Sequence, residues 1–302
     1  MRKQIWSMDD SRKKRDPGEP SPYRRWRDAK LSACPQGVDA LMVDIDRLAK
    51  ISANEAAELR DRIRRFNMAI YRCRDRTVDR ATIHAFAATF GLRRIDRHLC
   101  AGEDGVTALE KAVSGRRKRY IPYSNRSLSW HTDGYYNDST KPIRAILLHC
   151  MHAAAAGGEN GLLDPEIAYI NLYDPDPDFI AALSHPQCMT IPANRESGRE
   201  IRPARSGPVF SVDPVTGTLH MRFTAREKHV IWRDNAATRA AVAHLMDLLA
   251  DENGPALRHR LVPGQGIISN NVLHNRAAFD DDPPHQRLVY RARYFDRIET
   301  TD

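Results

Sequence analysis

The sequence predicts a single, mainly β domain that is supported by helices near its N-terminus. Apolar residues recur at helical spacing between residues 52 and 90, whereas short apolar runs separated by turn residues follow residue 119. The chain has 302 residues, of which 41% are hydrophobic and 28% charged, which is an ordinary balance for a globular protein with a core. Helices first and mainly strands later indicate a β core with helical supports.

Two helices are predicted ahead of the β part. The first covers residues 52–70, because Ser52 and Glu55 match a capping box and apolar residues follow at helical spacing. The second covers Thr77–Phe90, which has an apolar face and a glycine just past its end. Both helices belong to a helical part over about residues 40–95.

Strands dominate the rest of the predicted domain, with one more helix over Ala236–Ala250. Apolar runs bounded by turn residues indicate the strands, and a hairpin is expected around the turn Asp213–Gly217. The predicted strands and hairpin cover Arg144–Met151, residues 208–223, Gly266–Ser269 and Arg287–Phe295.

The net charge of +8 is unevenly distributed. Residues 1–30 hold ten Lys and Arg against five acidic residues, with several prolines and almost no apolar periodicity, so we expect a disordered or loosely attached arm there and one domain over residues 31–302. A second basic run, Arg116–Arg119, is expected in an exposed loop. Neither run carries a nucleic-acid-binding motif, which favours solvated charge or an anionic small-molecule partner over nucleic acid.

Composition also bears on location and redox chemistry. The sequence has no run of the ~18 apolar residues that a membrane span needs, and its start has no apolar run for a signal peptide, so we expect a cytoplasmic protein without membrane association. The five cysteines lie far apart without a C-x-x-C pair, which argues against a zinc ribbon, a thioredoxin motif and a disulfide framework. Buried free thiols are expected.

The stretch S-W-H-T-D-G at 129–134 carries the clearest chemical signal. Residues two apart in an extended segment point the same way, so His131 and Asp133 can offer a nitrogen and a carboxylate oxygen to one metal ion. A surface His–Asp hydrogen bond nevertheless explains most H-x-D pairs that occur alone. His274 follows far downstream. Two histidines and one carboxylate are the ligand set of non-haem Fe(II) oxygenases, which leaves positions open for a co-substrate and oxygen.

The last predicted strand places arginines beyond this ligand set. Arg287, Arg291 and Arg293 share one face of an extended strand. The planar fork of a guanidinium suits a carboxylate, because it can bind both oxygens at once.

Five motifs of the chain resemble the Fe(II)- and 2-oxoglutarate-dependent dioxygenases of the taurine dioxygenase family, which also includes γ-butyrobetaine hydroxylase-like members. These motifs occur in the family's order over about 160 residues. They are W-H-T-D at 130–133, G-G-E-N at 157–160, D-P-x-T-G at 213–217, P-G-x-G-I-I-S-N-N-V-L-H-N-R at 263–276 and R-L-V-Y-R at 287–291.

This resemblance implies the architecture and the metal site. The implied fold is a double-stranded β-helix, or jelly-roll barrel, over about residues 120–302, with a lid-type insertion over about residues 164–260. By position, His131, Asp133 and His274 are the implied Fe(II) ligands and catalytic residues.

The resemblance also implies the co-substrate site, with Arg287, Asn160 and Arg291 as the candidate residues for binding 2-oxoglutarate. Arg287 matches the partner of the distal carboxylate of 2-oxoglutarate. Asn160 stands where members often have Thr or Ser, and its amide can donate a similar hydrogen bond. Arg291 matches a position that grips the substrate's sulfonate in taurine dioxygenase. Two alternatives stay open for Arg291: it binds an anionic group of the substrate, or it pairs with a buried Asp or supports 2-oxoglutarate.

The implied reaction couples oxidative decarboxylation of 2-oxoglutarate, with O₂, to hydroxylation of a small organic substrate. One alternative is an oxygenase of the same fold that grips RNA or an acidic protein with its basic arm and Arg116–Arg119. Another is a jelly-roll binding protein without activity. Substrate identity is expected to depend on the insertion and on residues 97–105, while the substrate, the product and the oligomeric state are not predicted.

Overall fold

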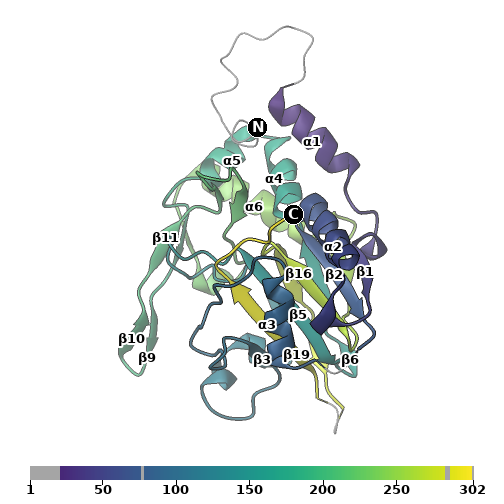
Figure 1. Ribbon diagram of the computed structural model, residues 1–302. Helices are drawn as coiled ribbons and strands as arrows, with labels where there is room; N and C mark the ends of the chain where they lie inside the picture. Colours follow the sequence, from purple (N-terminus) through teal and green to yellow (C-terminus); the bar gives the residue numbers. More distant parts are fainter. Residues whose placement is uncertain (1–20, 76–77, 283–285, 301–302) are drawn as a thin grey trace. The chain divides into compact units, whose positions relative to one another are not determined.

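The computed structural model describes residues 21–75, 78–282 and 286–300. Within these ranges the chain forms two compact units (Figure 1). The smaller unit contains residues up to 34, 165–222 and 229–254, and the larger unit contains 35–164, 223–228 and 255 onward. Every helix in the described ranges falls short of the length and hydropathy that a membrane span requires.

A six-stranded sheet forms one wall of the larger unit. Its order is β1-β2-β16-β5-β19-β3, and every neighbouring pair is antiparallel except β1 and β2. The strands cover Met42–Ile45 (β1), Met68–Cys73 (β2), Gln265–Ser269 (β16), Ala145–His152 (β5), Leu288–Tyr294 (β19) and Thr107–Leu109 (β3). Three predicted strands are therefore confirmed: Arg144–Met151 as β5, Gly266–Ser269 as β16 and Arg287–Phe295 as β19.

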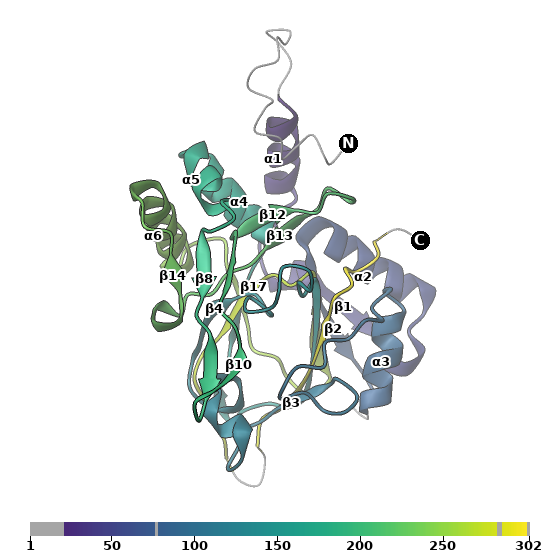
Figure 2. The same cartoon turned by 90° about the vertical axis from the view of Figure 1, so that its left-hand side faces the viewer.

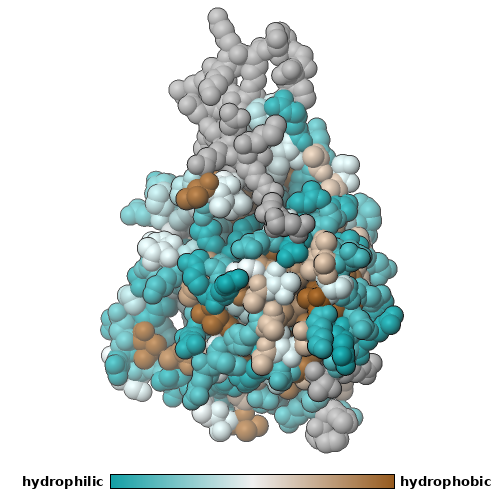
Figure 3. Space-filling view, viewed as in Figure 1, coloured by the Kyte–Doolittle hydropathy of each residue, from teal (hydrophilic) through white to brown (hydrophobic). Residues whose placement is uncertain are grey.

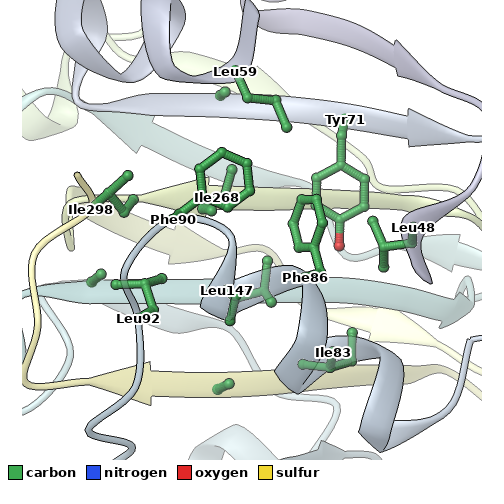
Figure 4. Close-up of a cluster of buried hydrophobic side chains, with 14 of the residues drawn as sticks. Leu48, Leu59, Tyr71, Ile83, Phe86, Phe90, Leu92, Leu147, Ile268 and Ile298 are labelled. Carbon is green, nitrogen blue, oxygen red and sulfur yellow. The ribbon is translucent and has the colours of Figure 1, made fainter. Parts of the chain in front are cut away.

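Two helices, α2 (Ala53–Phe66) and α3 (Arg80–Ala88), pack on this sheet. Ser52 and Glu55 form the predicted capping box. The helix ends earlier than predicted, because Asn67 adopts a left-handed conformation (φ 58°) and the chain turns directly into β2. Figure 4 shows the core that results, in which Phe86 and Phe90 of the α3 region pack toward Leu147 and Ile268 of the sheet.

A four-stranded antiparallel sheet with the order β15-β7-β17-β4 forms the other wall of the larger unit. Figure 2 shows β17 and β4 on one side of this unit and β1 and β2 on the other. The strands cover Leu257–His259 (β15), Asn160–Leu163 (β7), Leu273–Arg276 (β17) and Leu128–His131 (β4). A short pair, β6 (Ala156–Gly157) and β18 (Phe279–Asp280), and four 3₁₀ turns complete the unit: η3 (Val38–Leu41), η4 (Leu48–Lys50), η5 (Arg116–Arg119) and η6 (Ile121–Tyr123).

The smaller unit combines four helices with short strands. Its helices are α1 (Pro22–Ser32), α4 (Pro165–Tyr173), α5 (Pro177–Leu183) and α6 (Ala236–Ala250). Its strands form the sheet β11-β8-β14 and the two hairpins β9–β10 and β12–β13. The strands cover Met189–Ile191 (β8), Asn194–Glu196 (β9), Arg199–Arg202 (β10), Arg205–Gly207 (β11), Phe210–Val212 (β12), Leu219–Met221 (β13) and Ile231–Trp232 (β14). A last turn, η7, covers Glu227–His229, where the chain passes from the larger unit back into the smaller one. The predicted helix over Ala236–Ala250 and the predicted hairpin, now β12–β13, are both confirmed.

The prediction of a disordered or loosely attached arm is wrong for residues 22–30, which belong to helix α1. Residues 1–20, the rest of the predicted arm, lie outside the described ranges. Arg27 pairs with Asp174 at 2.6 Å, and Lys30, although its charge suggested solvent exposure, is buried and pairs with Glu166 at 2.7 Å. These ion pairs fix α1 to α4, which the local composition of the segment did not indicate. Elsewhere, hydrophilic residues predominate on the face drawn in Figure 3, and the predicted free cysteines are confirmed within the described ranges, four of the five being buried.

Candidate active site

The three predicted metal ligands lie together at the end of the four-stranded sheet. His131 on β4 and His274 on β17 are directly opposite each other, with ring centroids 4.3 Å apart. A ligand atom from each of His131, Asp133 and His274 lies within 4.8 Å of the others, and all three side chains are buried. The spacing and the ligand types fit one divalent iron ion held on one face, with the opposite face left open.

Hydrogen bonds fix which nitrogen of each histidine can bind a metal. The Nδ1 of His131 lies 2.9 Å from the carbonyl oxygen of Ser129, and the Nδ1 of His274 lies 2.8 Å from that of Val272. Each Nδ1–H therefore donates to the backbone two residues earlier, which leaves Nε2 as the free ligand. Burial lowers the pKa of both imidazoles, that of His131 to about 3, so both are in the neutral form that binds metal.

Asp133 reaches the histidines by a route that the sequence pattern did not predict. Strand β4 ends at His131, and Asp133 begins a turn that includes Gly134 at φ 71°. The side chain of Asn271 holds this turn: its Oδ1 accepts from the Asp133 amide at 2.8 Å, and its Nδ2 donates to the carbonyls of Asp133 at 2.9 Å and Ile143 at 2.7 Å. The argument from an extended H-x-D segment is thus only half correct, because a side chain from across the sheet orients the carboxylate.

Two arginines of β19 face the Asp133 carboxylate from the opposite sheet. Arg291 Nη1 lies 3.1 Å and Arg293 Nη1 lies 3.4 Å from Asp133 Oδ1. Arg293 also donates to Tyr136 Oη at 2.8 Å and pairs with Asp96. Burial opposes ionisation of Asp133, but the charges of Arg291 and Arg293 outweigh it and hold the pKa of the carboxyl below its usual range. Arg291 thus contacts a buried Asp. Whether it also binds the substrate or 2-oxoglutarate stays a prediction.

Arg287 lies just before β19 and is 6% exposed. Its Nη1 has no hydrogen-bond partner within the described residues, and its guanidinium lies 5.1 Å from the centroid of the Phe279 ring. Burial lowers the pKa of this guanidinium, with Cys150 and Asp281 acting in the opposite direction. A buried cation with an unsatisfied N–H is costly until an anion pairs with it, so the residue fits the distal carboxylate of a dicarboxylic acid.

The G-G-E-N segment packs beside Arg287, and its backbone conformation requires the two glycines. Gly157 and Gly158 have φ values of 68° and 79°, and a Cβ at Gly157 would lie 2.3 Å from the carbonyl oxygen of Ala278. Asn160, on β7, is buried, and its Nδ2 lies 3.4 Å from the carbonyl oxygen of His259. That contact uses one amide hydrogen of Asn160, and its role toward 2-oxoglutarate stays a prediction.

Residues 28–293 match the model of the family described as taurine catabolism dioxygenase TauD, TfdA family. The chain belongs to this family. The predicted family is confirmed. The buried ligand set, and the Nη1 of Arg287 that has no partner among the described residues, fit the Fe(II) and 2-oxoglutarate that this family uses.

Two curated relatives of this TauD/TfdA member are uridine-5'-phosphate dioxygenases. One, from Amycolatopsis sp, is 32% identical over 173 residues, which is 55% of this chain and 60% of that protein. The other, from Streptomyces sp, is 29% identical over 195 residues, which is 63% of this chain and 69% of that protein. The match to the first relative therefore spans less than two thirds of its length.

Solved structures place the fold within the same group. An asparagine oxygenase in complex with Fe(II), 3-hydroxyasparagine and succinate aligns with a TM-score of 0.57 at 16% identity, over 84% of this chain and 93% of that chain. The structure of AAD-2 with Mn(II) and N-oxalylglycine aligns with a TM-score of 0.59 at 15% identity, over 87% and 96%. The predicted mainly β fold with a jelly-roll core and added helices is thereby confirmed.

Proposed function

We propose that this chain couples oxidative decarboxylation of 2-oxoglutarate to hydroxylation of a small substrate that carries a phosphate group, as a nucleoside 5'-phosphate does. The observation that carries the reaction is a buried set of three metal ligands in the protonation state that binds iron. The Nη1 of Arg287, which has no hydrogen-bond partner among the described residues, supports the binding of the co-substrate. The names of the two curated relatives support the substrate class.

The protein's own residues have distinct tasks in this proposal. His131 and His274 would hold the iron through Nε2 and Asp133 through its carboxylate, while Arg287 would bind the distal carboxylate of 2-oxoglutarate. When bound, iron with 2-oxoglutarate supplies the activation of O₂ and the oxidation of a C–H bond. Asn271 and Arg293 act through Asp133 and keep its carboxylate directed at the metal position.

The charge balance of the site supports an anionic substrate. The arginines of the site outnumber its carboxylates by one, which leaves one net positive charge: Arg276, Arg287, Arg291 and Arg293 oppose Asp96, Asp133 and Asp281. A divalent metal ion and a dianionic 2-oxoglutarate cancel each other, so this positive charge remains. A substrate anion would neutralise it in a buried setting, where electrostatic interactions are stronger than in water.

The test is succinate release by the enzyme supplied with Fe(II), 2-oxoglutarate and O₂, in a screen of nucleoside 5'-monophosphates and the matching nucleosides. We expect a monophosphate to raise succinate release above the rate without substrate, and His274→Ala to abolish the increase. Stimulation by an unphosphorylated compound alone would reject the substrate class. Failure of the Fe(II)-loaded protein to consume 2-oxoglutarate with any compound would reject the reaction.

A further inference from the structure

Arg117 differs from its neighbours in the basic run that forms η5. Arg116, Lys118 and Arg119 are exposed, as predicted for a loop, but Arg117 is half-buried. Its Nη2 donates to the carbonyl oxygen of Cys100 at 3.1 Å, and its guanidinium lies 5.5 Å from the centroid of the Tyr123 ring. One cation of the run is therefore turned toward the interior of the larger unit.

Tyr123, on which Arg117 lies, has a buried hydroxyl group. The residue is 3% exposed, and its hydroxyl interacts with the thiol of Cys100, a weak hydrogen-bonding group, but with no nitrogen or oxygen atom among the residues that the structure describes. Burial raises the pKa of Tyr123 to about 12, while the positive charges of Arg291 and Arg117 act against this increase. Both arginines are thus close enough to the phenol to affect its ionisation.

Arg291 connects this group to the metal ligands. On β19 it stands opposite Thr107 of β3, whose Oγ1 lies 3.0 Å from Nε2 of His98. The Nη1 of Arg291 contacts Asp133, but its buried Nε has no partner within the described ranges. Arg117, Tyr123 and Arg291, which we call the Arg117 cluster, therefore combine two cations with a weakly bonded hydroxyl group beside Asp133, a candidate iron ligand.

The chemistry of the Arg117 cluster selects a particular ligand. His98 contributes no positive charge, because burial lowers its pKa to about 3 and its Nδ1 accepts from the amide of Cys100. The single negative charge of Asp133 faces both Arg291 and Arg293, so it does not offset the positive charge of Arg291 alone. Two guanidinium groups and a hydroxyl donor suit a dianion with several acceptor oxygens, and a phosphate monoester has both the charge and the oxygens.

We infer that Arg117 and Tyr123, together with Arg291, form the subsite for the phosphate group of the substrate. This inference rests on the proposed function and deepens it. Arg117 is then a specificity residue that distinguishes phosphorylated from unphosphorylated compounds. The alternative is that Arg117 only anchors the η5 turn to Cys100, in which case its removal affects every substrate equally.

The experiment measures the ratio of kcat/KM for a nucleoside 5'-monophosphate to kcat/KM for the matching nucleoside. Arg117→Ala should lower this ratio about 10- to 100-fold, the range expected for loss of a charge-assisted hydrogen bond. Arg117→Lys should recover part of the loss, and Tyr123→Phe should lower the ratio by a smaller factor. Lys118→Ala is the matched control, because it removes an exposed charge from the same turn and should leave the ratio unchanged.

A binding measurement separates this inference from the proposed function. Inorganic phosphate is titrated calorimetrically, without O₂, into protein loaded with Mn(II) and 2-oxoglutarate. The wild type should bind phosphate at least about tenfold more tightly than Arg117→Ala. Equal or absent binding overturns the subsite, as does an equal effect of Arg117→Ala and Lys118→Ala on the kinetic ratio. If phosphate binds through Arg117 but every nucleoside phosphate fails to stimulate succinate release, the subsite stands and the proposed nucleotide substrate is wrong.

Discussion

The guanidinium of Arg287 is buried against Phe279, and its Nη1 has no partner in the part of the chain that the structure describes, so replacing the residue should first affect binding of the co-substrate. Removing one member of a buried ion pair costs about 3–5 kcal/mol, so Arg287→Ala should raise the KM for 2-oxoglutarate at least about a hundredfold. Initial rates at varied 2-oxoglutarate concentrations give this KM, and the KM of Arg287→Lys should lie between those of the wild type and Arg287→Ala. An unchanged KM would assign Arg287 to structure.

Asn271 acts on the metal through the backbone of Asp133, and its neighbour provides a matched control. Asn271→Gly keeps a residue that tolerates φ 51° but removes three hydrogen bonds, and should weaken Mn(II) binding about 10- to 100-fold. Asn270→Ala also removes a buried amide, but one that contacts Asn67 and Ile298. Both variants should lose stability in urea, and only Asn271→Gly should lose metal affinity; equal metal affinities would contradict this role.

Residues with local signals could be predicted from the sequence, and residues that act across the sheets could not. His131, Asp133 and His274 stand in short motifs, and their side chains meet in the structure. Asn271 and Arg293 were missed as site residues, because their bonds to Asp133 span 138 and 160 residues. A side-chain amide or a guanidinium on a strand has many partners within reach, and only the fold selects one.

At the scale of elements, α3 stabilises the six-stranded sheet through aromatic packing. Phe86 is fully buried and lies 5.1 Å from the ring of Tyr71 and 5.2 Å from that of Phe90. Phe86→Ala should lower the free energy of unfolding by about 3–5 kcal/mol, since it removes a large side chain and leaves a cavity. Chemical denaturation measures the loss. Val113→Ala, at a position 77% exposed, should change stability by less than about 0.5 kcal/mol, and similar losses in both variants would contradict the packing argument.

Element types were predicted better than element ends. The capping box at Ser52 located the start of α2, but its end was placed too late, because Met68–Cys73 continues the apolar run and the break depends on the backbone of Asn67. Strand β2 was missed for the same reason. It lies between β1 and β16 and is buried at nearly every position, so it lacks the alternation that marks a half-exposed strand.

For the whole molecule, the buried histidines predict destabilisation in mild acid. Burial lowers the folded-state pKa of His98 and His131 to about 3 and that of His149 to about 4, well below the ordinary value of about 6.5. The unfolded chain therefore binds more protons below pH 6.5, so stability is complete above that pH and is lost as the pH falls toward 4.

Each such histidine contributes up to about 1.4 kcal/mol per pH unit to this loss. Urea denaturation of the metal-free protein between pH 7.5 and 5 measures it. His149→Gln, which keeps a polar group near Tyr71 but cannot become charged, should reduce the slope. A free energy of unfolding that stays constant down to pH 5 would show that these histidines are not held neutral by burial.

The central claim is that His131, Asp133 and His274 bind one iron ion that 2-oxoglutarate then joins. Anaerobic calorimetric titration of Fe(II) in the presence of 2-oxoglutarate tests it most directly, with circular dichroism to verify that each variant is folded. The wild type should bind one Fe(II) per chain, and folded His131→Ala and His274→Ala should bind none over the same concentration range. Binding of Fe(II) by either variant with the stoichiometry and affinity of the wild type would contradict the assignment.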